Sequence, residues 1–501
     1  MRRRLQRLRS EHGAVLPLVG IMLVVLLGLS AFATDLGWFY LNANRAQRAA
    51  DAAALAGVIY MPAEFATTAS STALQIAGAN GFTDGVDGVV VTPSKVKDAG
   101  GVTDSPYELR VTVTATVPTF FLKVLGKSSQ TITRSAVAEF VPPLPMGSPQ
   151  SQFGNACDPR QSGCTNQPNF WANIHGKYTD TKMGDAYSSW CPDKSGSGKN
   201  CDTSPNPSWR DRGYLYGIEV ASGTTSFTVN TLDLALHTPG GDPKRTGDHN
   251  VCGGCGGAGH TVTATLYVPD STPLDVTDAI PVCTVTKGPE PELAAGAPYV
   301  WEPLCTVVNP VTGIYTLEIK VDTPNANDDT GLNRYSLNVT GIGATPHLYG
   351  IGDISIFNNI SAISADFYLA EVDSAYRGKT FVVELYDPGD AQNNVSNIIS
   401  FRGPPDGTIP WTSGCRISTR DEVTDDWSPL ATIGSGSPCE IDATRPAHNY
   451  DGKWLKTEFD LPAGYPGGWW KVHYAYNGTA QDTTTWRAYI IGSPLHLVLG
   501  K

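Results

Sequence analysis

One uncharged apolar stretch stands out from the hydropathy pattern and covers residues 14–34. At 1.5 Å per residue, a helix of this length crosses the hydrocarbon core of a bilayer. Five arginines lie in the preceding segment 1–13, whereas Asp35 and an aromatic cluster at positions 38–40 follow the stretch. Arginines collect on the cytoplasmic side of membranes and aromatic residues at the interfaces. The pattern predicts one transmembrane helix over 14–34, a cytoplasmic basic segment over 1–13, and a C-terminal bulk outside the cell membrane.

A cleaved signal peptide is the alternative interpretation of this stretch. Residues 31–33 read Ala-Phe-Ala, which is the A-x-A pattern of signal peptidase sites. The apolar stretch is longer than a typical signal h-region, and helix-forming residues rich in alanine continue to Tyr60. We therefore expect an uncleaved anchor, with cleavage left open.

The pattern beyond the apolar stretch predicts a small α+β stalk domain over residues 35–141. Positions 65–79 are rich in alanine and threonine and favour a helix, while 89–92 and 109–117 alternate as β-strands do. A proline-rich segment from Val141 then interrupts both periodicities. We expect a linker over 142–167.

The rest of the chain alternates in short strands separated by turn residues, which is typical of antiparallel sandwiches of jelly-roll or immunoglobulin-like type. Similar sequence patterns recur in the same order and predict two related modules, over 168–343 and 344–498. Chance similarity of two β-rich segments is the alternative. The paired segments are 266–270 with 385–389, 313–320 with 468–475, and 333–339 with 486–491.

The N-terminal segments resemble a known family. The resemblance is carried by Gly-Ala-Val before the apolar helix, Asp35-Leu36-Gly37 after it, the alanine-rich run 49–57, and the segments 107–126 and 135–139. Together these are similar to the TadE/TadG-like region of tight-adherence (Flp) pilus-assembly proteins over about residues 11–141. The resemblance implies a membrane-anchored component of a pilus or a related secretion assembly. The fifth residue after Gly13 is Leu18 rather than the Glu of pilin-like members, so prepilin cleavage is not expected.

The charge of the chain limits the kinds of molecule that we expect it to bind. The chain of 501 residues has a net charge of −12 although its first twelve residues are basic, so the exported part is more acidic still. A negative surplus repels phosphate backbones, and no basic stripe with interleaved aromatics is present. We therefore expect the lipid bilayer and other pilus-assembly or envelope proteins as partners, a surface glycan as a further ligand, and no nucleic acid.

All ten cysteines follow the membrane segment, in a compartment where disulfides persist. Many connectivities are compatible with ten cysteines. Pairing of neighbours predicts the bridges Cys157–Cys164, Cys191–Cys201, Cys252–Cys255, Cys283–Cys305 and Cys415–Cys439.

Two sets of residues could bind metal ions. His249, Cys252, Cys255 and His260 have ligand types suited to tetrahedral zinc, although a Cys252–Cys255 disulfide is favoured in an oxidising compartment. The acidic loops that contain Asp322, Asp328, Asp329, Asp387 and Asp390 could bind calcium, but they lack EF-hand spacing and are expected to be turns. We predict no cofactor and no resident metal.

The sequence carries no nucleophile elbow, zincin helix or phosphate-binding loop. The expected role is therefore structural, with the outer modules used for adhesion or protein interaction. An exported carbohydrate-active hydrolase or carbohydrate-binding protein is the alternative, because paired carboxylates are usually far apart in sequence. Strand alternation also predicts that Trp469 and Trp470 point to opposite faces of their sheet, with one at or near a surface.

Overall fold

The structure is a computed structural model of the chain. It describes residues 15–58, 60, 68–97, 104–140, 143–158, 163–164, 169–176, 179, 181–188, 206, 210, 212–238, 248–250, 260–269, 273–291, 297–322, 331–360, 364–388, 396–421, 427–444, 450–476, 480–491 and 495–497. The chain forms two compact units, one of residues 1–142 together with 493–501 and the other of residues 143–492.

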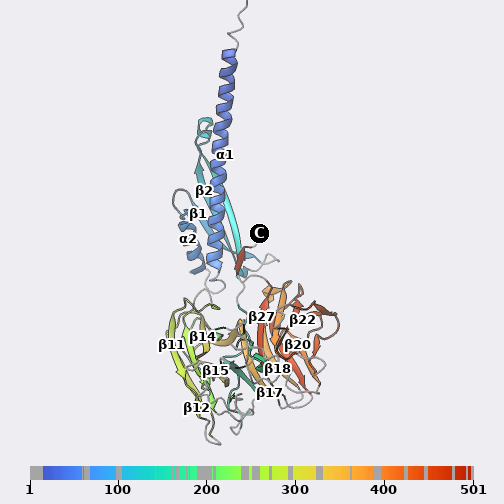
Figure 1. The fold of residues 1–501 in the computed structure, drawn as a ribbon. Coiled ribbons are helices and arrows are strands. Elements are labelled where there is room, and N and C mark those ends of the chain that lie inside the picture. The colour runs from blue at the N-terminus through green and yellow to red at the C-terminus, as the bar shows by residue number, and fades with distance from the viewer. Residues whose placement is uncertain are drawn as a thin grey trace, which may run out of the picture. The chain divides into compact units, whose positions relative to one another are not determined.

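The first unit is built on one long helix, α1 (Val15–Val58). Its first half is apolar and exposed, and it is the one helix among the described residues that is long and apolar enough to cross a membrane. Its second half buries a face of alanines, Ala46, Ala50 and Ala53 among them, in the core of the unit. Small side chains three or four positions apart let the sheet approach the helix closely. The predicted apolar helix and its alanine-rich continuation are therefore one uninterrupted element (Figure 1).

A sheet and a short helix pack on this alanine face. The elements are α2 (Ser70–Ala79), β1 (Val90–Lys97), β2 (Asp104–Pro118), η3 (Leu122–Leu125), β3 (Ser129–Phe140) and β28 (Leu495–Leu497). The strands pair antiparallel in the order β1-β2-β3-β28, and Leu109, Val111 and Val113 of β2 are fully buried against the helix. The α+β fold predicted for this region is present. The closing strand comes from the C-terminus, and Leu495 pairs with Phe140.

The second unit begins with a jelly-roll sandwich. Its eight main strands are β5 (Asn169–His175), β6 (Tyr214–Val220), β7 (Thr224–Leu232), β10 (Thr261–Tyr267), β11 (Pro281–Lys287), β13 (Trp301–Val308), β14 (Gly313–Asp322) and β15 (Gly331–Gly343). One sheet has the order β5-β15-β7-β13 and the other β6-β14-β10-β11. This interleaving of early and late strands is the arrangement of a jelly roll. The edge strand β16 (His347–Ile351) pairs with β6.

A second jelly roll follows, and seven of its eight main strands take the same order as in the first sandwich. Its main strands are β17 (Asp353–Ile360), β18 (Ser364–Val372), β19 (Thr380–Tyr386), β20 (Asn397–Gly403), β22 (Cys415–Asp421), β25 (Lys453–Asp460), β26 (Gly468–Tyr476) and β27 (Ala480–Ile490). One sheet contains β17-β27-β19-β25-β22 and ends in β23 (Ala431–Ile433), and the other contains β18-β26-β20 with β21 (Ile409–Pro410) and β24 (Glu440–Asp442). The remaining short elements are β4 (Gln152–Phe153), β8 (His237–Thr238), β9 (His249–Asn250), β12 (Glu290–Pro291), η4 (Thr181–Met183) and η5 (Ser374–Tyr376).

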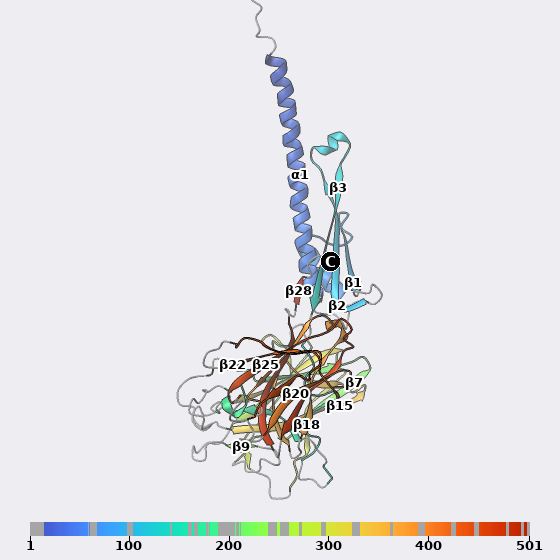
Figure 2. The same cartoon turned by 90° about the vertical axis from the view of Figure 1, so that its right-hand side faces the viewer.

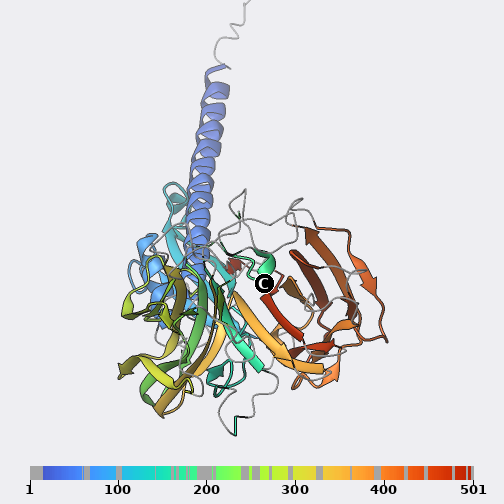
Figure 3. The same ribbon diagram turned by 60° about the horizontal axis from the view of Figure 1, so that its bottom comes forward.

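The first strands of the two sandwiches pair with each other. Strand β5 lies between β15 and β17, with Ala172 opposite Ile356, so one 12-stranded sheet of the described residues runs through both sandwiches. Figure 3 shows the sandwiches side by side, the first in green to yellow and the second in orange to red. Strands β14 and β26 are the seventh strands of their sandwiches, and β15 and β27 are the eighth. These two pairs of segments, which resemble each other in sequence, therefore occupy equivalent positions. The segment at 266 lies on the fourth strand and that at 385 on the third, so this sequence pairing is not an equivalence.

Aromatic side chains fill the space between the two sheets of each sandwich. Phe227 on β7 contacts Tyr315 on β14 with ring centroids 5.1 Å apart, and Phe381 on β19 lies 5.0 Å from Trp470 on β26. As alternation predicts, Trp470 is fully buried while Trp469 lies on the opposite face, half-buried against Tyr368.

Candidate functional site

Three of the predicted cysteine pairs lie among the described residues, at disulfide distance. The Cα atoms are 5.9 Å apart in Cys157–Cys164, 6.2 Å in Cys283–Cys305 and 6.0 Å in Cys415–Cys439. Cys283–Cys305 joins the fifth and sixth strands of the first sandwich, whereas Cys415–Cys439 joins β22 to the segment that leads into β24. Cys283 on β11 and Cys305 on β13 belong to opposite sheets, so their bridge fastens one sheet to the other. Cys191, Cys201, Cys252 and Cys255 lie outside the described residues.

The structure describes only part of the predicted metal ligands. His249 lies on β9, and the His260 side chain is buried just before β10. Asp322 ends β14 and accepts a hydrogen bond of 2.5 Å from Thr263 Oγ1, while buried Asp387 has φ 56° and accepts one of 2.7 Å from Gly452 N. Within the described ranges no three His, Cys, Asp or Glu side chains come together as a metal site. Asp328, Asp329 and Asp390 lie outside these ranges, so the zinc and calcium sites, which the sequence disfavours, stay untested.

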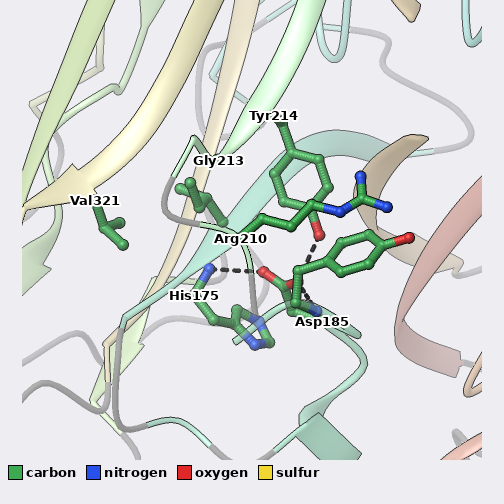
Figure 4. Close-up of a pocket in the computed structure, with 8 residues that line it drawn as sticks. His175, Asp185, Arg210, Gly213, Tyr214 and Val321 are labelled. Carbon is green, nitrogen blue, oxygen red and sulfur yellow. Dashed lines mark hydrogen bonds between the residues drawn. The ribbon is translucent and has the colours of Figure 1, made fainter. Parts of the chain in front are cut away.

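A buried polar pocket lies near the junction of the two sandwiches (Figure 4). Asp185, from the connection between β5 and β6, is at its centre and accepts three hydrogen bonds. The donors are the backbone N of His175 at 3.0 Å, the backbone N of Tyr187 at 3.1 Å and the hydroxyl of Tyr214 at 2.5 Å. The lining is completed by Ile174, Arg210, Gly213 and Val321. This arrangement holds the connection against the first two strands of the first sandwich.

The connection between β5 and β6 also contacts charged side chains of the second sandwich. Arg210 forms an ion pair with Asp353 of β17, and its guanidinium lies 3.9 Å from the centre of the Tyr187 ring. Arg487 of β27 hydrogen-bonds the Tyr187 hydroxyl and, at 2.9 Å, Glu384 of β19. Tyr187 is thus held between two arginines. The connection is thus fastened to the first sandwich by the hydrogen bonds of Asp185 and to the second by the Arg210–Asp353 ion pair and the Arg487–Tyr187 hydrogen bond.

Burial shifts the pKa values of Asp185 and His175 in this pocket. Desolvation raises the pKa of Asp185 to about 6, against the opposing effect of the hydrogen bonds from Tyr214, His175 and Tyr187. Burial also holds the pKa of His175 well below its usual value, helped by the charges of Arg334 and His260. Neither ring nitrogen of His175 has a hydrogen-bond partner among the described residues. A neutral His175 therefore lies beside Asp185, whose carboxylate takes up a proton near pH 6.

The pocket joins parts of the chain and has little room for a ligand. Its free volume of about 10 Å³ accommodates one water molecule at most. Residues of the connection also dock on β27, because the Thr485 hydroxyl accepts a hydrogen bond of 3.0 Å from Ala186 N and donates one of 2.9 Å to Gly184 O. The small free volume and the paired charges indicate that the connection between β5 and β6 holds the two sandwiches together. The sequence gives no signal for this contact, because the residues of the connection carry no motif and Thr485, which they contact, lies some 300 positions further along the chain.

Comparison with known proteins bears on the first unit. No curated protein matches the chain. A family model, Tad, described as Flp pilus-assembly TadE/G-like, matches residues 13–66. These residues comprise the apolar half of α1, its alanine-rich half and the segment that follows. The resemblance expected over residues 11–141 is thus confirmed for its N-terminal part, and the N-terminal region of this chain is TadE/G-like.

Proposed function

We propose that this chain is a membrane-anchored, extracytoplasmic structural component of a tight-adherence pilus or related secretion assembly. Its two jelly rolls act outside the membrane in adhesion or protein interaction. The observation that carries the proposal is the continuity of α1, whose TadE/G-like apolar half runs without a break into the alanine face of the stalk core. The N-terminus faces the cytoplasm, as the arginine asymmetry favours.

The connectivity of the chain suits a tether. The chain leaves the first unit after β3 and returns to it in β28, and Leu495 of β28 pairs with Phe140 of β3. The jelly rolls are therefore an insertion between two strands of the anchored sheet. A pull on them is shared by two covalent connections and by the hydrogen bonds of adjacent strands, which suits a part that bears load.

The outer unit is built to keep its shape. The β5–β17 pairing and the contacts of the β5–β6 connection with Asp353 and Thr485 fix one jelly roll against the other, so the unit presents a constant surface to a partner. Anchoring then holds that surface at high local concentration beside membrane-bound partners. Tethering is the contribution that we assign to α1.

The test is to release the outer parts from the membrane in the organism's own cells. Expression of residues 34–501 as a soluble exported fragment should abolish surface adherence or pilus assembly even though the jelly rolls fold. A matched control replaces residues 14–34 with an unrelated transmembrane helix and should restore the phenotype, because only the tether is required. A soluble fragment that works as well as the full chain would refute the structural role.

A second variant tests the outer unit. Because Phe140 and Leu495 are paired neighbours, residues 143–492 can be replaced by a short flexible linker that leaves the first unit connected. This variant should remain in the membrane and lose the crosslinks that the full chain makes to envelope proteins. If the crosslinks persist, the partner-binding surface lies in the first unit instead.

A further inference from the structure

The hairpin between β2 and β3 ends in an apolar tip beside the membrane-spanning half of α1. The tip consists of residues 119–128 and contains η3 (Leu122–Leu125). Figure 2 shows the hairpin running along α1 toward the N-terminal end of the helix. Its closing bonds join Thr119 N to Ser128 O at 3.0 Å and Thr119 Oγ1 to Lys127 O at 2.5 Å. The tip is therefore a closed loop with a defined conformation.

Asp35 fixes the position of this tip along the axis of α1. It is the first charged residue after the apolar stretch, and its side chain is buried under the tip. Its carboxylate accepts hydrogen bonds from three successive backbone N–H groups, those of Phe120 at 2.7 Å, Phe121 at 3.0 Å and Leu122 at 2.7 Å. The tip consequently lies at the level where α1 leaves the hydrocarbon core.

The side chains of the tip face outward and are apolar. Val124 and Leu125 are 83% and 80% exposed, and Phe120 and Phe121 are 46% and 49% exposed. In water such a cluster would be unfavourable, whereas at a membrane interface its burial is favourable. The tip also carries exposed lysines at positions 123 and 127, which suit anionic headgroups.

The neighbouring face of α1 has the same character. Trp38 packs edge-on against Phe120 with ring centroids 5.5 Å apart, so the aromatic cluster of the helix and that of the tip form one belt. A groove of about 310 Å³ between helix and hairpin is lined by Phe32, Leu36, Val117 and Leu122 among others. Aromatic belts and apolar grooves at this height are what a bilayer interface contacts.

We propose that the tip, residues 119–128, inserts into the outer interfacial layer of the bilayer and forms a second membrane contact beside the spanning helix. Phe121, Val124 and Leu125 enter the acyl-chain boundary, while the two lysines of the tip extend to lipid phosphates. The contact would stop the stalk from tilting freely about the end of the span. This inference rests on the anchored topology proposed above.

Spin labelling of the full-length protein tests the insertion. The protein is reconstituted in vesicles of phosphatidylcholine and phosphatidylglycerol, and a nitroxide is attached to a Val124→Cys variant. A matched control is Gln75→Cys, at an exposed position of α2, and this helix packs beside Gly57, about 33 Å further along α1 than Asp35. The unsubstituted chain, carried through the same labelling, measures any background from its own cysteines.

The label at position 124 should be several-fold more accessible to oxygen, relative to a water-soluble nickel complex, than the label at position 75. Its depth should be about 5–10 Å below the headgroups. Equal access of the nickel complex to both positions would overturn the insertion. Protection of position 124 from both reagents would also overturn it, because a protein or a second copy would then cover the tip. Failure of the chain to float with the vesicles would instead refute the anchor.

Discussion

The side-chain amide of Asn173 donates a hydrogen bond of 2.7 Å to the hydroxyl of Ser355, and this buried bond crosses from one jelly roll to the other. The two residues lie on β5 and β17, the first strands of the two sandwiches, and are 182 positions apart in sequence. Both side chains are fully buried. The bond therefore belongs to the pairing that makes the two sandwiches one unit.

Ser355→Ala should destabilise the outer unit. The substitution leaves the buried amide of Asn173 without its acceptor, which costs about 1–3 kcal/mol of the free energy of unfolding. Urea denaturation followed by tryptophan fluorescence measures the loss. The control is Thr306→Val, which removes an exposed hydroxyl pair with Thr228 and should change stability by less than about 0.5 kcal/mol. Similar losses in the two variants would contradict a special role for the junction.

Sequence patterns predicted the parts of this fold that depend on neighbouring positions. The apolar stretch, the alanine-rich helix and the placement of Trp469 and Trp470 on opposite faces all follow from local periodicity. The return of β28 to β3 and the Asp185–Tyr214 contact do not, because each joins segments that carry no distinctive pattern of their own. Strand order was likewise beyond local reasoning, which is why segment 266–270 was paired with a strand in a different position.

The Asp185 site predicts an unusual dependence of stability on pH. Its pKa is about 6 in the folded protein against an ordinary value of 3.8, so the folded state binds a proton first as the pH falls. The contribution of this group to the free energy of unfolding therefore increases from pH 7 to pH 4, by up to about 3 kcal/mol. The measurement is the difference in unfolding free energy between the unsubstituted chain and Asp185→Asn across this range.

Asp460 provides the matched comparison for the pH series. Hydrogen bonds from Arg416 hold its pKa below the ordinary value, so its stabilising contribution is present above about pH 4 and declines as the pH falls further. From pH 7 to pH 4 the difference in unfolding free energy between the unsubstituted chain and Asp460→Asn should thus stay nearly constant, and below pH 4 it should change with the opposite sign. Parallel profiles for the two variants would show that Asp185 is not protonated near pH 6.

Gly184→Ala should loosen the connection from β27. Gly184 has φ 95°, and an added Cβ would overlap the backbone carbonyl of Thr483. We expect a loss of more than about 3 kcal/mol, since both strain and steric overlap contribute. Gly436→Ala has a similar φ of 92° with open space around the Cβ, so it reports the backbone strain alone, about 1 kcal/mol. Thermal unfolding that ranks the two equally would refute the docking.

The Cys415–Cys439 bridge should stabilise the second jelly roll. Its two cysteines are 24 residues apart, and closing a loop of that length is worth about 3 kcal/mol in the chain-entropy description. Replacing both cysteines by alanine should lower the urea midpoint, and adding reductant to the unsubstituted chain should lower it in the same direction. A midpoint unaffected by the double substitution would mean that the sheets are held together without the bridge.

Asp35→Ala should free the hairpin tip without releasing the protein from the membrane. The substitution removes the acceptor of three backbone N–H groups, whereas the apolar stretch of α1 is unchanged. A nitroxide at Val124→Cys should therefore become more mobile in its spectrum, while the protein still floats with vesicles. Thr34→Ala is the control, because among the described residues the Thr34 hydroxyl donates within its own helix, to Ser30 O, and its loss should leave the label as it was.

The pH dependence of the same label separates the Asp35 contact from simple packing. Burial raises the pKa of Asp35, but the hydrogen bonds from Leu122, Phe120 and Phe121 outweigh it and bring the pKa below the ordinary 3.8. The contact is consequently complete at pH 5 and weakens only as the carboxylate is protonated below pH 4. The label should therefore keep its low mobility from pH 7 to pH 5 and gain mobility in more acidic solution. Mobility that already increases between pH 7 and pH 5, or that is the same with and without Asp35, would show that the carboxylate does not hold the tip.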